Sequence, residues 1–400
     1  MCGLVGFLGG IASQDKIVDE ALLKKMTNSI IYRGPDDSGS WIDLKNRMGL
    51  GHRRLSILDL SLEGHQPMQS LRSRYVIAYN GEIYNHLDLR KEIDLCHAPA
   101  ADKTSSAEWR GHSDTESLLA GFDAWGIKGT VDRARGMFAF AVWDRKKETL
   151  TLARDRVGEK PLYYGWQGRG NDAVFLFGSE LKALRVHPAF EKNINRGAIS
   201  LLLRHNCIPA PYSIYEGVHK LLPGSLLSVS LRDRSPKIST YWSGAQIAEE
   251  GTAKSSLVNP EQAVDELEAL LMKAVGQQMI ADVPLGAFLS GGVDSSTVVA
   301  LMQAQSSNPV KTFSIGFEVA DYNEAEVAKA VAGHLATDHT ELYVTEKEAM
   351  DVIPRLPALY DEPFSDSSQI PTFLVSQLAR QHVSVSLSGD AGDELFCGYN

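Results

Sequence analysis

Cys2 is the first residue of this 400-residue sequence whose position suggests chemistry. If Met1 is removed, Cys2 carries a thiol and a free α-amino group on one residue. A thiol has a pKa of about 8.5 and an α-amino group one of about 7.7–8.0, so the neutral amine can take the thiol proton near pH 7. A secretory leader is disfavoured, because no positive charge precedes Lys16 and glycines interrupt the apolar run. Cys2 is therefore either a buried small hydrophobe or an N-terminal nucleophile.

A second candidate is LSGGVDSST at 289–297, where an expected strand gives way to an expected helix. Backbone N–H groups and hydroxyls at such a junction form an anion site. The residues that can supply them are Ser290, Gly291, Gly292, Ser295, Ser296 and Thr297. Asp294 would repel a phosphate unless a cation were present, so the pattern predicts phosphate together with Mg²⁺. The lysine of a Walker A loop is absent, and the competing interpretation is a structural strand–turn–helix with a serine cap.

The composition sets limits on function. The formal net charge of −10 disfavours nucleic-acid binding, and the sequence contains no apolar run of membrane length. Cysteines 2, 96, 207 and 397 show neither disulfide nor zinc-ligand spacing, which favours a reducing, cytoplasmic setting.

The first half of the chain combines short strand patterns with amphipathic helices and predicts an α+β layered domain. Strands are expected at 74–80, 137–143, 149–155 and 173–179, and helices at 19–32 and 114–125.

From Glu261 onward, helix and strand patterns alternate and predict an α/β doubly wound parallel sheet. Helices are expected at 261–280 and 323–336, and strands at 285–289, 311–317 and 340–344. The polar, small-residue stretch 244–261 predicts a linker. We therefore expect domains at 2–190 and 261–400, joined by a connecting segment at 191–260.

Several motifs resemble those of one family, and they follow one another along the chain in the same order as in that family. CGLVGF, YRGPDDSG, GHRRLSILD, YNGEIYNH, HSDTE and RGMFAFAVWD resemble a class II glutamine amidotransferase domain. SGGVDSS resembles the PP-loop of the ATP pyrophosphatases, and HVSVSLSGDAGDELFCGYN resembles a landmark of the glutamine-hydrolysing asparagine synthetases. The resemblance implies an αββα N-terminal nucleophile (Ntn) hydrolase domain followed by a PP-loop synthetase domain.

The resemblance implies roles in the first domain. Cys2 becomes the mature N-terminus, and its thiolate attacks the side-chain amide of glutamine. The Asn80 side chain and the Gly81 backbone N–H stabilise the oxyanion. The residues implied to bind the amino-acid end are Arg54 for the α-carboxylate, and Asp114 with Glu82 for the α-ammonium group.

In the second domain the resemblance implies ATP binding and adenylation of a carboxylate acceptor, most simply aspartate, which the released ammonia converts to asparagine. The implied nucleotide-site residues are Leu289, Ser290, Gly291, Gly292, Asp294, Ser295, Ser296, Ile315, Ser388 and Gly389. Asp294 and Asp393 are implied to hold Mg²⁺ and pyrophosphate. A homodimer is a further expectation, with neither nucleic acid nor membrane as partner.

Two departures from the family pattern leave the acceptor open. Asp390 and Ala391 stand where many members have Glu-Gly, and EPFSDSSQIPTFLV at 362–375 resembles a bacterial branch tied to surface-polysaccharide synthesis. The acceptor could therefore be a uronic acid. Members of the family continue with a helical segment that carries an acceptor-activating lysine, so we expect the second domain to be incomplete at residue 400.

Two functions of a different class also fit the motifs. The chain could be a stand-alone N-terminal cysteine hydrolase with a degenerate second domain. It could also be a non-enzymatic protein that senses glutamine or a nucleotide.

Overall fold

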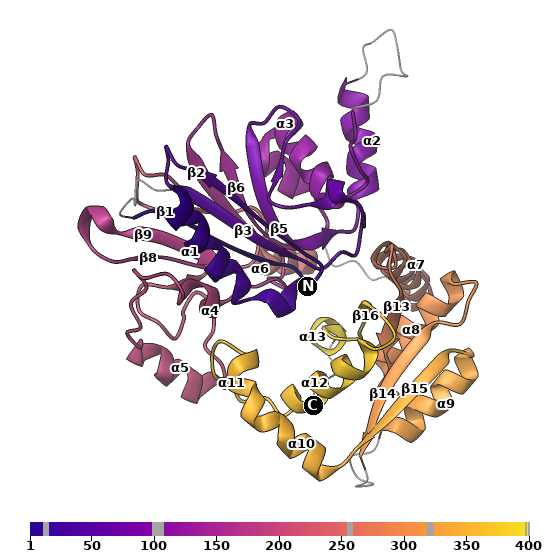
Figure 1. The fold of residues 1–400 in the computed structure, drawn as a ribbon. Helices are drawn as coiled ribbons and strands as arrows, with labels where there is room; N and C mark the ends of the chain where they lie inside the picture. The colour runs from indigo at the N-terminus through magenta and orange to yellow at the C-terminus, as the bar shows by residue number, and fades with distance from the viewer. Residues whose placement is uncertain (11–15, 98–107, 254–258, 318–323, 397, 399–400) are drawn as a thin grey trace. The chain divides into compact units, whose positions relative to one another are not determined.

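The computed structural model describes residues 1–400 except 11–15, 98–107, 254–258, 318–323, 397 and 399–400. Cys397 and the expected start of the helix at 323–336 therefore lie outside the described residues. The chain divides into two compact units, Met1–Ser255 with Asp361–Phe364, and Ser256–Tyr360 with Ser365–Asn400 (Figure 1).

The first unit is built on two six-stranded antiparallel sheets. The first sheet has the order β10 (His219–Lys220), β8 (Tyr163–Gln167), β9 (Val174–Gly178), β1 (Gly3–Gly9), β3 (Met48–Arg54) and β2 (Asp37–Asp43). The second has the order β12 (Lys237–Thr240), β11 (Ser225–Val229), β7 (Thr149–Arg154), β6 (Gly136–Asp144), β5 (Tyr75–Ile83) and β4 (Met68–Gln69). The helices are α1 (Lys16–Asn28), α2 (His86–His97), α3 (Asp114–Arg133), α4 (Leu181–Leu184), α5 (Arg196–His205) and α6 (Gly244–Ala253).

Side-chain alternation along the strands produces three apolar layers in this unit. On β1, Leu4 and Leu8 join the core between the two sheets, whereas Val5 and Phe7 pack in the layer that contains residues of α1 and α4. On β5, Tyr79 points away from the core between the sheets and packs with Phe122 of α3 in a third layer. Helices thus cover the outer face of each sheet (Figure 1), which confirms the αββα expectation.

The stretch expected to be a linker contains a helix. Residues Gly244–Ala253 form α6, and none of its side chains is buried. An exposed helix needs no apolar stripe, so its polar, small-residue composition resembles that of a loop. Upstream of it, β11 pairs with β7 and therefore continues the second sheet of the first unit.

The second unit contains a parallel sheet of order β15 (Asp338–Val344), β14 (Lys311–Phe317), β13 (Leu285–Phe288) and β16 (Val385–Leu387). Ala287 packs in a layer with residues of α8 and α9, whereas Phe288 packs on the opposite face with residues of α12. The sheet is therefore doubly wound, as expected. Its helices are α7 (Pro260–Gln278), α8 (Val293–Gln305), α9 (Ala325–Leu335), α10 (Glu346–Val352), α11 (Leu356–Leu359), α12 (Gln369–Ala379) and α13 (Gly392–Phe396).

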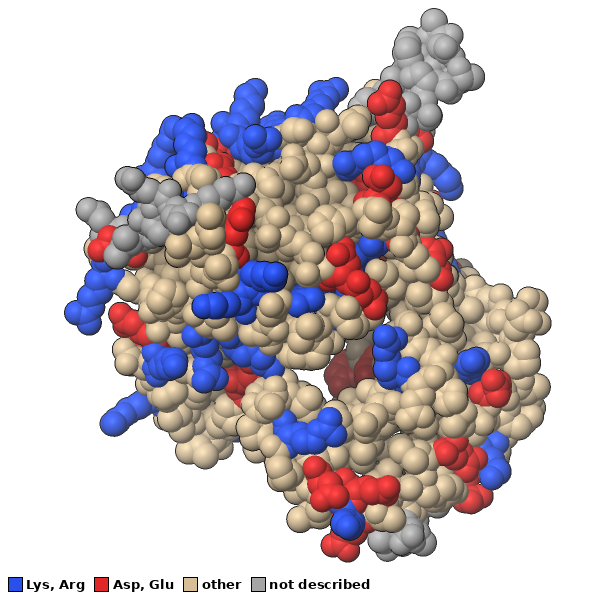
Figure 2. Space-filling view, viewed as in Figure 1, with Lys and Arg blue, Asp and Glu red and all other residues tan. Residues whose placement is uncertain are grey.

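Charged side chains of both signs lie on the surface of the first unit. On the visible face of the first unit, basic and acidic side chains are interspersed (Figure 2). Lys45 and Arg232, for example, both pair with Glu148, at 2.7 and 2.6 Å. In the described part of the chain, no helix combines the length and the apolar character needed to cross a bilayer.

Candidate functional site

All six residues predicted for the glutamine site line one pocket of the first unit. They are Cys2, Arg54, Asn80, Gly81, Glu82 and Asp114. Cys2 directly precedes β1 in one sheet, whereas Asn80 to Glu82 lie near the end of β5 in the other. The predicted nucleophile and the predicted oxyanion donors are therefore carried by different sheets.

The Cys2 thiol lies against the backbone of Leu55. The Leu55 N–H is 3.4 Å from Cys2 Sγ, and the Leu55 carbonyl oxygen is 3.6 Å from it. Arg33 Nε donates to the Cys2 carbonyl oxygen at 2.8 Å, and Arg33 is itself paired with Glu180 at 2.7 Å. These contacts fix both the backbone and the sulfur of Cys2.

Burial raises the pKa of the Cys2 thiol, and the N-terminal ammonium group, the next largest influence, lowers it. Met1 is present in the structure, so that ammonium group belongs to Met1. Removal of Met1 would bring the charge onto Cys2 itself and strengthen the lowering.

Within the part of the chain that the structure describes, the pocket lining includes no histidine that could serve as a base. His52 on the neighbouring β3 forms a hydrogen bond of 2.8 Å with the Tyr79 carbonyl oxygen, and burial lowers its pKa to about 4. His52 is therefore neutral at pH 7, and its hydrogen bond is structural. A processed Cys2 would place its own α-amine next to the thiol, where it could act as a base.

Asn80 carries an unsatisfied donor at the pocket. The residue is 1% exposed, and its buried Nδ2 has no hydrogen-bond partner among the described atoms. Burying an unpaired donor lowers the free energy of unfolding by about 1–3 kcal/mol. An oxygen atom placed within hydrogen-bond distance of Nδ2 would recover this free energy. Gly81 follows, where a Cβ would lie 2.3 Å from the Met137 carbonyl oxygen, so only glycine allows this approach of β5 to β6.

Arg54 is buried at the end of β3 and held by the loop that follows it. Its guanidinium donates to the carbonyl oxygens of Leu58 at 3.3 Å and Ser61 at 3.1 Å, and also to that of Asp59. At Gly64 a Cβ would lie 1.8 Å from Arg54 Nη2, so glycine leaves the space that the guanidinium fills. A fixed guanidinium of this kind suits a carboxylate ligand.

Two carboxyl groups lie in the same pocket. Asp114 Oδ2 accepts from the Tyr79 hydroxyl at 2.6 Å and from the Ile83 N–H at 2.8 Å, while burial raises the pKa of Asp114. Burial, followed by the negative charge of Asp114, raises the pKa of Glu82 to about 8. The pocket thus combines a guanidinium with a carboxyl pair, the arrangement that a zwitterionic amino acid requires.

Lys160 also lines this pocket and was not predicted from the sequence. It is 5% exposed, its Nζ lies 2.8 Å from Met137 Sδ, and burial lowers its pKa. A thioether is a weak acceptor for an ammonium group. The sequence signal is a lysine directly before the apolar stretch PLYY, which by itself does not distinguish a buried lysine from an exposed one.

The raised pKa of Glu82 predicts a pH-dependent stability. Its ordinary pKa of 4.5 rises to about 8 on folding, which means that the folded state favours the protonated carboxyl. The contribution of Glu82 to the free energy of unfolding is therefore fully present below pH 4.5 and is lost as the pH rises through 8. Glu82→Gln removes this loss. The free energy of unfolding of the variant minus that of the parent should therefore be larger at pH 8.5 than at pH 5, by on the order of a few kcal/mol. Urea titration at both pH values measures this difference. Glu63→Gln, at an exposed position, is the control, and a pH-independent difference for Glu82→Gln would contradict the prediction.

The predicted nucleotide site of the second unit lines a hollow between the start of α8 and a later stretch that comprises residues 388–394, Phe396 and Gly398. The predicted residues that line it are Ser290, Gly292, Asp294, Ser295, Ser388, Gly389 and Asp393. Leu289, Gly291, Ser296 and Ile315 are not among the lining residues. Leu289 is buried in the layer with α8, Ile315 packs near α10 and α12, and Ser296 Oγ is buried without a hydrogen-bond partner among the described atoms.

The hollow suits a magnesium–phosphate group. Gly292 precedes the first residue of α8, and no side chain of the described residues caps this helix, which leaves its first turn open to an anion. Asp294 and Asp393 line the same hollow, and a Cβ at Gly392 would lie 2.2 Å from Asp294 Oδ2. Among the described residues no group of three or more acidic, histidine or cysteine side chains could hold a metal. Two carboxylates with phosphate oxygens and water is the set that Mg²⁺ commonly uses.

The departure at Ala391 has a structural consequence. Ala391 has a φ of 74°, in the left-handed region that favours glycine. An alanine there costs roughly 1 kcal/mol. Beside it, the Ser388 hydroxyl donates to Asp390 Oδ2 at 2.9 Å. The Asp-Ala pair thus places a strained residue where glycine would be relaxed.

Residues 1–242 match the family of the glutamine amidotransferase domain, and residues 266–400 match that of asparagine synthase. An αββα amidotransferase domain followed by such a synthase domain defines a class of glutamine-dependent ligases. The chain belongs to the glutamine-hydrolysing asparagine synthetase family.

Curated relatives match this chain over its whole length. A Methanocaldococcus jannaschii protein, provisionally named asparagine synthetase (glutamine-hydrolysing) 2, is 39% identical, and the match covers 76% of that protein. Asparagine synthetase (glutamine-hydrolysing) 1 of Bacillus subtilis is 35% identical, with 59% of it covered. A more distant relative, the amidase chyE of Penicillium rubens, is 29% identical, again with 59% covered. The chain thus spans 59% to 76% of the length of these relatives.

Proposed function

We propose that this protein hydrolyses glutamine at Cys2 and transfers the ammonia to a carboxylate that the second unit activates with ATP. The observation that carries the proposal is the buried, unpartnered Nδ2 of Asn80 in the pocket that also contains Cys2. An unpaired donor in the same pocket as the thiol is available to an oxyanion that develops there.

The geometry supports a two-stage mechanism. The α-amine of processed Cys2 takes the thiol proton, and the thiolate attacks the side-chain carbonyl carbon of glutamine, which converts the carbonyl oxygen to an oxyanion. Asn80 Nδ2 and the Gly81 N–H donate to that oxyanion. Collapse of the oxyanion breaks the C–N bond. The α-ammonium group of Cys2 gives its proton to the leaving nitrogen, and ammonia departs. Water, deprotonated by the same amine, then cleaves the thioester to give glutamate and the free thiol.

The charged residues select the substrate. Arg54 pairs with the α-carboxylate, while Asp114 and Glu82 bind the α-ammonium group. Because Arg54 and Asp114 are both buried, each interacts more strongly with an opposite charge than it would on the protein surface. A bound α-ammonium group favours the ionised form of Glu82.

In the second unit, we propose that ATP binds with its phosphates at the start of α8 and adenylates the acceptor. Mg²⁺ held by Asp294 and Asp393 would neutralise pyrophosphate charge. Aspartate is the proposed acceptor, because two relatives carry the name asparagine synthetase. A different carboxylate is the second candidate, supported by the relative named as an amidase and by the changed loop at Asp390 and Ala391.

The test is a product assay with glutamine, ATP and Mg²⁺, supplied with aspartate or with uronic acids. Glutamate, AMP, pyrophosphate and asparagine in equal amounts would support the aspartate proposal. A uronamide would identify the second candidate acceptor, and glutamate without AMP would indicate a stand-alone hydrolase. Tight glutamine binding without turnover would favour a sensor.

Asp294→Asn should separate the two activities. The change keeps the side-chain shape but removes a charge needed beside magnesium and phosphate, so acceptor-dependent pyrophosphate release should fall at least about 100-fold. Glutamine hydrolysis should change less than about twofold, because the Cys2 pocket lies in the other unit. Asp351→Asn, at an exposed position on α10, is the control. Undiminished pyrophosphate release would rule out the role given to Asp294.

A further inference from the structure

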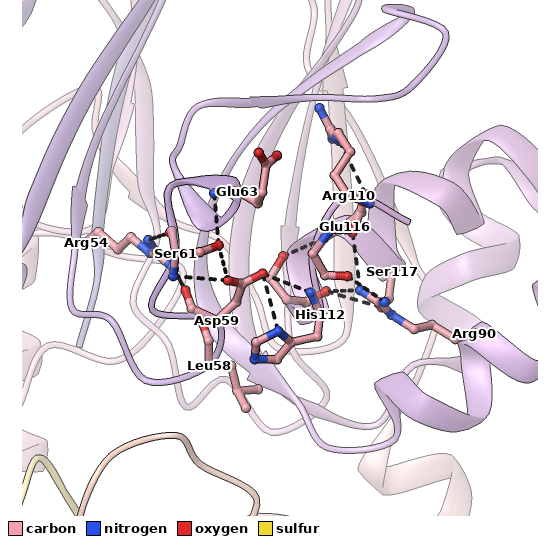
Figure 3. A network of polar contacts seen from close by, with 12 residues as sticks. Arg54, Leu58, Asp59, Ser61, Glu63, Arg90, Arg110, His112, Glu116 and Ser117 are labelled. Carbon is pink, nitrogen blue, oxygen red and sulfur yellow. Dashed lines mark hydrogen bonds and ion pairs between the residues drawn. The ribbon is translucent and has the colours of Figure 1, made fainter. Parts of the chain in front are cut away.

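Asp59 lies at the centre of a polar network that the proposed mechanism does not use (Figure 3). It is 1% exposed, in the loop after β3, and its φ of 58° is left-handed. One carboxylate oxygen accepts from the Ser61 N–H at 3.2 Å and from the Ser61 hydroxyl, and the other accepts from the His112 N–H at 2.9 Å. The His112 ring nitrogen Nδ1 is 3.8 Å from the second oxygen. One buried carboxylate thus joins two loops.

The first of these loops holds Arg54. The carbonyl oxygens of Leu58, Asp59 and Ser61 all accept from its guanidinium. Because the Asp59 carboxylate bonds to Ser61 within the same loop, it fixes the turn that aims these carbonyls at Arg54. The position of the guanidinium therefore depends on the position of Asp59.

The second loop leads into α3 and Asp114. Glu116 accepts from the N–H groups of Arg110 at 2.9 Å and Gly111 at 3.1 Å, and Arg90 donates to the carbonyl oxygens of Gly111 and Ser113, both at 2.9 Å (Figure 3). This loop is consequently held in place up to the N-cap of α3, which is Ser113. At Gly111 a Cβ would lie 2.1 Å from Asp59 Oδ2, so the loop backbone approaches the carboxylate as closely as glycine permits.

We propose that Asp59 is a positioning residue that sets the separation of Arg54 and Asp114, and so makes the pocket selective for the α-amino-acid end of its substrate. This inference rests on the proposed function. Arg54 and Asp114 lie 60 positions apart in the sequence, and the Asp59 carboxylate bonds the loop that holds one to the loop that leads to the other. Opposite charges recognise a zwitterion only when both are held at the matching distance.

Asp59→Asn tests the proposal with little change in shape. An amide cannot accept on both sides, so its NH₂ must face either the His112 N–H or the two donors of Ser61, and one loop is released. The KM for glutamine should rise about tenfold or more, while kcat changes less than about threefold. The preference for glutamine over glutaramate, which lacks the α-amino group, should fall about tenfold, as measured by the ratio of kcat/KM values.

Two further variants complete the experiment. Glu63→Gln changes an exposed carboxylate on the same loop and should leave KM and the preference within about twofold of the parent. Ser61→Ala removes one hydrogen bond to Asp59 and should lower the preference by about threefold, so it carries the test if Asp59→Asn does not fold.

The outcomes separate the two levels of inference. A parent protein without glutaminase activity overturns the proposed function and the positioning role with it. An active parent whose folded Asp59→Asn and Ser61→Ala variants keep their preference for glutamine overturns only the positioning role. Equal losses on glutamine and glutaramate, through kcat alone, overturn it as well, since they would indicate general damage.

Discussion

Cys2→Ala should abolish glutamine hydrolysis, with kcat at least about 1,000-fold below the parent value. No neighbouring group replaces the thiol, because its nearest described polar contacts are the N–H and carbonyl groups of Leu55. Synthesis from ammonium at mildly alkaline pH should persist, since the acceptor site only requires neutral ammonia. Glutamate release and amide product are measured separately.

Cys207→Ala is the matched control for this variant, because Cys207 is an exposed free cysteine. It should retain full activity with both nitrogen sources. Continued glutamine hydrolysis by Cys2→Ala would exclude Cys2 as the nucleophile. Loss of ammonia-dependent synthesis in a folded Cys2→Ala protein would show that the two activities cannot be separated.

Asn80→Ala should lower kcat for glutamine hydrolysis by about 100- to 1,000-fold, equivalent to about 2.7–4 kcal/mol of transition-state stabilisation. The reason is that its buried Nδ2 has no hydrogen-bond partner among the described atoms and is proposed to donate to the oxyanion, so its loss should affect the transition state more than the bound substrate. KM should change less than about threefold. Steady-state kinetics measures both.

Asn193→Ala, at an exposed position, serves as the control for Asn80→Ala and should be fully active. A folded Asn80→Ala variant with kcat within about twofold of the parent would refute an oxyanion role. A rise in KM alone would instead assign Asn80 to substrate binding.

Two strands that the sequence patterns did not predict, β1 and β3, have both faces covered. On β1, GLVGFLG, every residue is buried, so the alternation of apolar and polar residues that marks a half-exposed strand is lacking. On β3 all seven residues are buried as well, and they include His52, Arg53 and Arg54. A polar sequence of this kind indicates a strand only once its hydrogen-bond partners are known. By contrast, β6 and β14 were predicted to within a residue or two, because their aromatic and β-branched runs are distinctive.

The candidate site divides in the same way. Cys2 could be named from its place at the N-terminus, and Asn80 and Asp114 from the resemblance of YNGE and HSDTE to family motifs; the structure places all three in one pocket. Their roles remain predictions. Lys160 and Asp59 could not be named, because their importance comes from burial and from partners distant in the sequence, which no local pattern encodes.

Because the pocket is divided between two sheets, its geometry depends on how the core between those sheets is packed. Cys2 is fastened to one sheet and Asn80 to the other, and the apolar layer that includes Leu4 and Trp143 sets the spacing between them. A close-packed interior transmits small changes in volume instead of absorbing them. Removing a methylene from that layer would therefore be expected to lower the stability of the unit and also to change the separation of Cys2 from Asn80. If Cys2 and Asn80 act together as proposed, the geometry of their reaction depends on a hydrophobic layer that is not part of the pocket lining.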